Sequence, residues 1–278
     1  MKGLLTADVC PLIHKETPMH LLVCIKQVPA YFGQLVPDTR HEWIAPVPGA
    51  EWKMNRFDTI AVEAAIQLKE THPSITIDVI SMGPQRVQEV LRRALGMGAD
   101  RAIHVEGPEH GYLPPSDVAG ALHAATCATD YDLILTGILS EDLMQAQTGP
   151  MLAALRGIPC VAGATALDLT DTGSVIRILK EMEAGIRQPI LTKLPVLVTL
   201  QAGGYQPRYP NVRNLVAANR VDIPLIKADL PPAGAHLRET AAGTRLPDAS
   251  RKCKFIDGSL EEKTDAVIAL ARQRNLIA

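Results

Sequence analysis

The sequence predicts an α/β protein built on a Rossmann-like, doubly wound and mainly parallel sheet. Apolar runs typical of strands alternate four times, between residues 20 and 157, with segments whose apolar residues recur at helical spacing. The first run, 20–28, is typical of a strand buried in a parallel sheet. This alternation favours βαβ units with right-handed crossovers and helices covering the sheet.

The elements follow in order along the chain. Strands are predicted at 20–28, 75–82, 101–106 and 132–136, and residues 32–53 are expected to form a loop or a short hairpin. We expect Asn55 with Asp58 to form a capping-box-like helix start, and Ser116 and Thr148 to cap later helices. The alternation ends near residue 157.

A different pattern follows. Residues 167–169 and 175–180 predict a hairpin, 195–201 predicts another strand of the main sheet, and 212–216 predicts a short helix. Ser259 and Glu262 indicate a capping box for a last helix. We therefore expect an N-terminal extension at 1–19, an α/β nucleotide-binding domain at 20–222, and a C-terminal arm and helix at 223–278.

Composition excludes several classes of protein. The chain of 278 residues has a net charge of −2, which gives no reason to expect nucleic-acid or lipid binding, and no run approaches about 18 consecutive apolar residues. The five cysteines show no metal-site or disulfide spacing. Cys24 and Cys127 lie in apolar runs and are expected to be buried, as in a reducing compartment. No catalytic triad or metal cluster is evident, so we expect a non-catalytic protein. We expect it to be located in the cytoplasm, with the mitochondrial matrix as the alternative.

The most informative stretch is 132–150. A buried strand ends at Gly137, a polar loop follows, and Thr148 opens a helix. Ligands bind at the carboxyl ends of parallel strands, and free N–H groups at helix starts attract phosphate, so we interpret the stretch as a nucleotide-phosphate cradle. An ordinary capped βα loop is the alternative. Because Glu141 and Asp142 are acidic and the loop has no lysine, we expect one phosphate on backbone N–H groups and carboxylates turned to ribose hydroxyls.

A second exposed segment is expected at 202–208. Gly203 and Gly204 next to Tyr205 predict a mobile loop, which is either a linker or a docking surface for a partner.

Several motifs in order make the chain resemble the β subunit of electron transfer flavoproteins. They are LLVCIKQVP at 21–29, MNRFD at 54–58, VISMGP at 79–84, ALGMGADRAIHVE at 94–106, GILSEDLMQAQTG at 137–149, and KLPVLVTL with QPRYPNVRNLVAANR ending at 220. The resemblance implies an electron-carrier subunit that pairs with an α subunit holding most of an FAD and that binds a structural AMP. It also implies transient partners, namely an acyl-CoA dehydrogenase-type donor and a quinone oxidoreductase-type acceptor. The C-terminal arm would contact the α subunit.

The resemblance also implies site residues. Tyr31 and Phe57 would approach the FAD of the α subunit, and Ala202, Gly203, Gly204 and Tyr205 would dock partners. The residues implied to contact the nucleotide are Cys24, Asn55, Phe57, Asp58, Met82, Gly137, Glu141, Asp142, Gln145, Ala146, Gln147 and Thr148.

Departures from the family pattern leave alternatives open. Ile138 and Leu139 replace the usual basic residue and glutamine, and Gly204 stands where we expect a leucine anchor. The KQVP, SMGP and YPNVR motifs are similar to a bifurcating branch in which a second FAD replaces AMP, whereas QTG at 147–149 favours AMP. An alternative of another class is a stand-alone adenine-nucleotide enzyme or sensor.

Overall fold

The computed structural model describes residues 18–30, 36–38, 43–44, 49–109, 111–170, 173–227, 243–245 and 255–277. The chain divides into two compact units, Met1–Thr244 and Arg245–Ala278, which we describe separately.

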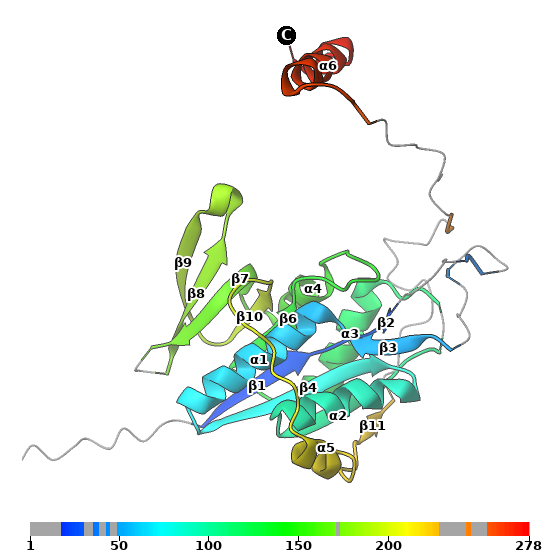
Figure 1. The fold of residues 1–278 in the computed structure, drawn as a ribbon. Coiled ribbons are helices and arrows are strands. Elements are labelled where there is room, and N and C mark those ends of the chain that lie inside the picture. Colours follow the sequence, from blue (N-terminus) through cyan, green and yellow to red (C-terminus); the bar gives the residue numbers. More distant parts are fainter. Residues whose placement is uncertain are drawn as a thin grey trace, which may run out of the picture. The chain divides into compact units, whose positions relative to one another are not determined.

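The first unit is built on a nine-stranded sheet with the order β11-β5-β4-β1-β6-β10-β7-β8-β9. The strands from β11 to β7 are parallel, and β8 and β9 add an antiparallel edge. The predicted fold class is therefore confirmed (Figure 1). The strands are β1 (Met19–Cys24), β4 (Ile75–Gly83), β5 (Arg101–Glu106), β6 (Leu133–Gly137), β7 (Cys160–Leu169), β8 (Val175–Glu181), β9 (Arg187–Lys193), β10 (Val196–Leu200) and β11 (Leu225–Ile226).

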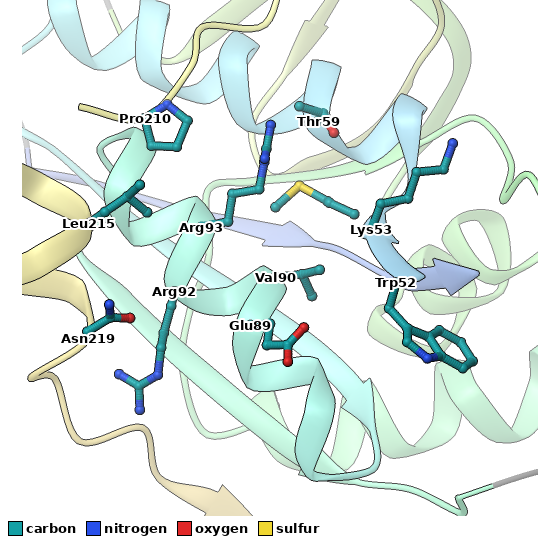
Figure 2. A pocket seen from close by; sticks show the side chains of 11 residues that line it. Trp52, Lys53, Thr59, Glu89, Val90, Arg92, Arg93, Pro210, Leu215 and Asn219 are labelled. Carbon is teal, nitrogen blue, oxygen red and sulfur yellow. The ribbon is translucent and has the colours of Figure 1, made fainter. Parts of the chain in front are cut away.

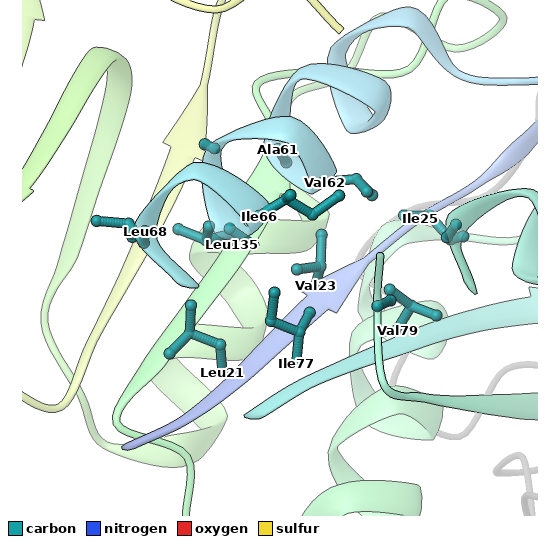
Figure 3. Close-up of a cluster of buried hydrophobic side chains, with 14 of the residues drawn as sticks. Leu21, Val23, Ile25, Ala61, Val62, Ile66, Leu68, Ile77, Val79 and Leu135 are labelled. Atoms are coloured by element: carbon teal, nitrogen blue, oxygen red, sulfur yellow. The ribbon is translucent and has the colours of Figure 1, made fainter. Parts of the chain in front are cut away.

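Helices cover both faces of this sheet because its strands are apolar on both sides. Leu21 and Val23 of β1 pack into a core with the first two helices, whereas Leu22 and Cys24 point to the opposite face and a second core. Figure 3 shows the first core between β1 and α1. The helices are α1 (Arg56–Thr71), α2 (Gln88–Met97), α3 (Pro115–Thr126), α4 (Thr148–Arg156) and α5 (Val212–Ala218).

One strand prediction is corrected, and one strand is added. The run 20–28 is two strands, because the chain leaves the main sheet after Cys24 and its continuation, β2 (Gln27–Ala30), pairs with β3 (Glu51–Met54) in a separate hairpin. Strand β9 was not predicted. It lies at the sheet edge, and most of its side chains are exposed, so it lacks the apolar pattern of a buried strand.

Three helix starts and one cysteine also differ from prediction. The N-caps of α3 and α4 are Pro114 and Gln147 in place of Ser116 and Thr148, and Asn55 is the N-cap of α1 without a side-chain capping bond. Cys24 is buried as predicted, but Cys127 is exposed because it lies just beyond the end of α3.

The second unit contains the predicted last helix, α6 (Leu260–Gln273). The capping box between Ser259 and Glu262 is confirmed, and no residue of α6 is buried within the structure. Its apolar residues Leu260, Val267 and Leu270 are exposed. Across the described ranges of both units, no helix has the length and apolar character needed to span a membrane.

Candidate functional site

The strongest candidate site is a cavity of about 510 Å³ at the carboxyl ends of β1, β4 and β6, here called the strand-end cavity. Strand order reverses at β1, since the chain passes from β1 to β4 and β5 on one side and continues with β6 on the other. Open α/β sheets bind ligands at such a reversal. Cys24, Met82 and Gly137 bring the three strand ends to the cavity wall.

Most of the residues expected to contact a nucleotide line this cavity. Phe57 is packed beside the core and Glu141 lies outside the lining, so neither joins the wall. Tyr31 lies outside the described residues. The expected residues that do line the cavity are Cys24, Asn55, Asp58, Met82, Gly137, Asp142, Gln145, Ala146, Gln147 and Thr148.

Asp58 and Asn55 tie the start of α1 to the strand ends. The buried Asp58 carboxylate accepts the Lys26 N–H at 2.7 Å and the Gly137 N–H at 3.0 Å. The Asn55 side chain donates to the Leu139 carbonyl at 2.9 Å and accepts the Glu141 N–H at 3.1 Å. These hydrogen bonds join α1 to the chain just after β1, to β6 and to the loop after β6. Asn55 and Asp58, both expected to contact the nucleotide, therefore also fix the shape of the cavity wall.

Glycine is required where α1 meets β6. A Cβ on Gly137 would lie 2.3 Å from Asp58 Oδ1 and 2.9 Å from the Asp58 backbone nitrogen. Any larger residue would therefore break the Asp58 contacts or displace α1.

Lysines from outside the loop balance its two acidic residues. Lys26 Nζ lies 2.7 Å from Asp142 Oδ2, and Lys53 Nζ lies 3.2 Å from Glu141 Oε2. Glu141 also accepts the Arg56 N–H at 3.2 Å. Both carboxylates are thus held by protein groups, and the lysines balance the acidic charge of the loop.

The loop ends in two residues with an uncommon backbone conformation. Met144 and Ala146 have φ values of 55° and 56°, a left-handed conformation that non-glycine residues seldom adopt and that occurs often at functional sites. Helix α4 then begins without a side-chain cap. Its first N–H groups, from Thr148 and Gly149, are of the kind that binds phosphate in other proteins, and both residues line the cavity.

Burial shifts the pKa of two groups at the site. Burial raises the pKa of Asp58 to about 7, and hydrogen bonds from Asn55, Lys26 and Gly137 only partly oppose it. Burial also raises the pKa of the Cys24 thiol to about 12, with a further contribution from the nearby Asp58. The Cys24 thiol is therefore uncharged at neutral pH. It does not have the lowered pKa that a nucleophilic cysteine needs.

Comparison with known proteins settles the family. Residues 47–230 match the model of the electron transfer flavoprotein domain. The chain is 31% identical over 228 residues to the electron transfer flavoprotein subunit beta of Bacillus subtilis, with 81% of this chain and 87% of the relative covered. The chain belongs to the electron transfer flavoprotein β subunit family. The subunit beta of Megasphaera elsdenii is 34% identical, with 76% and 78% covered, and that of Homo sapiens is 34% identical, with 75% and 81% covered.

A further wall of the strand-end cavity was not predicted from the sequence. Gln27 is 7% exposed and donates to the Arg86 carbonyl at 3.1 Å. Its Oε1 and the Arg86 Nε are buried and have no hydrogen-bond partner among the residues that the structure describes. The Arg86 guanidinium lies 3.9 Å from the centre of the Trp52 ring. The rarity of tryptophan and the polar Gln27 inside an apolar run were the available signals.

The 202–208 loop is fixed to the sheet. A Cβ on Gly204 would lie 1.6 Å from the Thr165 carbonyl oxygen, so Gly204 faces β7 and cannot act as an outward anchor. The Tyr205 hydroxyl accepts the Leu167 N–H at 2.8 Å, and its ring packs beside the core. Ala202, Gly203 and Gly204 remain exposed. The expected exposure is present, but Tyr205 is half-buried and anchored.

A metal centre is not evident in the described part of the chain. In the ranges that the structure describes, no cluster of three or more His, Cys, Asp or Glu side chains is placed to hold a metal.

Proposed function

We propose that this chain is a non-catalytic electron-carrier subunit that binds an adenine nucleotide, AMP in the first instance, in the strand-end cavity. The observation that carries the proposal is the convergence of three parallel strand ends, the uncapped start of α4 and the balanced Lys26–Asp142 pair on one cavity. The phosphate lies on the Thr148 and Gly149 N–H groups, and the base lies toward Cys24 and Met82. The AMP has a structural role.

The redox chemistry belongs to an FAD shared with an α subunit, and this chain contributes orientation and electrostatics. Phe57 and Tyr31 lie beside that flavin. The complex receives electrons from an acyl-CoA dehydrogenase-like donor and passes them to a quinone-linked or other acceptor. The names of the relatives, each a flavoprotein subunit beta, support a heterodimer.

Two surfaces of this chain contact protein partners in the proposal. The arm and helix at 223–278 bind the α subunit, since α6 has no buried residue and exposes Val267 and Leu270. Residues 202–205 dock transient partners through the exposed edge of the loop. The free thiols of Cys24, Cys127 and Cys160 support a reducing compartment such as the cytoplasm.

A second FAD in place of AMP is the other candidate, and one observation favours it. The strand-end cavity extends beyond the start of α4 to Gln27 and Arg86. The Gln27 Oε1 acceptor and the Arg86 Nε donor, which have no partner among the described residues, would suit a ring with neighbouring N–H and carbonyl groups. AMP alone leaves these atoms without a partner.

Co-expression with a candidate α subunit tests the proposal. The purified complex should be yellow, and denaturation should release FAD together with AMP, or FAD in twofold excess over the complex if the second candidate is correct. A colourless chain that hydrolyses ATP would instead support the stand-alone enzyme, and a yellow complex with one FAD and no other nucleotide would remove the adenylate site from the proposal.

A further inference from the structure

A second cavity lies outside the strand-end cavity and is not used by the proposed function. This lateral cavity, of about 490 Å³, is lined by residues of β3, α1, α2 and the segment that contains α5. Figure 2 shows its side chains, with Arg93 extending from α2 toward Thr59 and with Lys53 on the neighbouring strand. Its size is within the range of small-molecule sites.

Positive charge predominates in the lateral cavity. Lys53, Arg92 and Arg93 line it, and Glu89 is the only acidic residue among the described lining residues. Arg92 donates only to neutral acceptors among the described residues, namely the Ala218 carbonyl at 2.6 Å, the Val221 carbonyl at 2.9 Å and the Gln88 side chain at 3.4 Å, so hydrogen bonding does not cancel its charge. A chain with a net charge of −2 therefore presents a local cationic site.

Arg93 is the distinctive group. It is half-buried and, among the residues that the structure describes, makes no hydrogen bond or ion pair. A guanidinium carries five donors in a planar fork that matches carboxylate and phosphate oxygens. Lys53 is the second donor within the lateral cavity, and its exposed pair with Glu141 is of the weak surface type, so it can turn toward a ligand.

Much of the remaining wall of the lateral cavity is apolar. Met54 and Val90 are buried, Pro210 and Leu215 line the cavity beside them, and Thr59 and Asn219 add two polar groups. A bare inorganic ion would leave this surface uncovered. The cavity therefore combines a cationic side with an apolar floor, which suits an anion that carries an apolar group.

We propose that the lateral cavity binds a small organic anion, whose carboxylate or phosphate group is held by Arg93 and Lys53 and whose apolar part lies on Met54, Val90 and Leu215. The proposal does not depend on the nucleotide or on partner docking. Of the residues that would hold the anion, only Lys53 has a hydrogen bond or ion pair to the loop after β6.

Calorimetric titration of the full chain in complex with its α subunit tests this site, with AMP present in excess to occupy the strand-end cavity. The probes are benzoate, phenyl phosphate and inorganic phosphate, each at constant ionic strength set with chloride. We expect saturable binding of benzoate or phenyl phosphate, and whichever binds more tightly identifies a carboxylate or a phosphate ligand. Arg93→Gln should weaken it about tenfold or more, because it removes a charged hydrogen-bond donor.

Matched variants make the outcome decisive. Arg213 is an exposed residue of α5 that does not line the cavity, so Arg213→Gln should leave binding of the organic anion unchanged. Arg93→Lys should give an intermediate loss of affinity, because it keeps the positive charge but not the planar set of guanidinium donors. The proposal is overturned if neither organic anion binds saturably, if Arg93→Gln binds as tightly as wild type, or if inorganic phosphate binds as tightly as phenyl phosphate. Loss of AMP binding alone would count against the proposed function and leave this result unaffected.

Discussion

Arg208 should be one of the most costly surface-accessible residues to replace, because it compensates a buried charge on α1. Glu63 is 2% exposed. Arg208 donates to its carboxylate through Nε at 2.9 Å, Nη2 at 2.8 Å and the backbone N–H at 3.0 Å. Arg208→Met leaves Glu63 with the Gln67 amide and the backbone N–H of residue 208. Removing one partner of a buried pair costs about 3–5 kcal/mol.

The reverse substitution should cost less. Glu63→Gln leaves Arg208 beside Glu70, to which it donates through Nη2 at 3.1 Å, so no buried charge is left uncompensated and we expect a loss of about 1–3 kcal/mol. Urea unfolding of the wild type and both variants at neutral pH measures the two losses. A loss below about 1 kcal/mol for Arg208→Met, or an equal loss for Glu63→Gln, would refute the reasoning.

The same pair predicts a pH dependence. Burial opposes ionisation of Glu63, but hydrogen bonds from Arg208 and Gln67 outweigh it and lower the pKa. A carboxyl whose pKa is lowered on folding stabilises the fold above its unfolded pKa of 4.5 and loses that contribution as pH falls through the lowered value. The stability difference between wild type and Arg208→Met should therefore shrink in acid, and a constant difference would contradict this.

Three further predictions concern the site and the 202–208 loop. The pKa of Asp58 is raised on folding from 3.8 to about 7, so the folded state holds a proton that the unfolded state has lost between these values. The free energy of unfolding of the wild type should therefore fall relative to that of Asp58→Asn as pH rises from about 4 through 7, by a few kcal/mol at most. A difference in urea unfolding that does not change with pH would argue against a raised pKa. Gly204→Ala should destabilise the chain by several kcal/mol in thermal unfolding, since the new Cβ meets the Thr165 carbonyl oxygen, and an unchanged melting temperature would show that the loop does not contact β7. Tyr205→Phe should cost about 1–3 kcal/mol because the Leu167 N–H loses its acceptor, and amide exchange at Leu167 should quicken; unchanged exchange would show that the bond is absent.

The fold and the position of the cavity were predictable because they depend on local patterns. The apolar strand ending at Gly137 and the helix beginning at Thr148 are visible within twenty residues, and parallel strands place such junctions at one edge. The charge balance of the loop was not predictable. Lys26 is 116 residues from Asp142 in the chain, and the two meet only through the packing of β1 beside β6.

Other differences have the same origin. Asn55 and Asp58 have the spacing of a capping box, but their side chains bond to the loop after β6 and to Lys26 and Gly137, because tertiary acceptors and donors compete with the helix end. Gly204 looks like a residue of a mobile loop, and only the closeness of the Thr165 carbonyl shows that it is a packing residue. Spacing identifies the element, but the direction of a side chain depends on neighbours far along the chain.

Native mass spectrometry of the intact complex, for the wild type and for Gly137→Ala, is the most direct test of the strand-end cavity as a nucleotide site. The wild-type mass should equal the two chains, one FAD and one further adenine nucleotide. Gly137→Ala should lose the further nucleotide and keep the FAD, because its Cβ would disrupt Asp58 at the cavity wall. A wild-type complex without a second nucleotide, or a variant that retains it fully, would contradict the account.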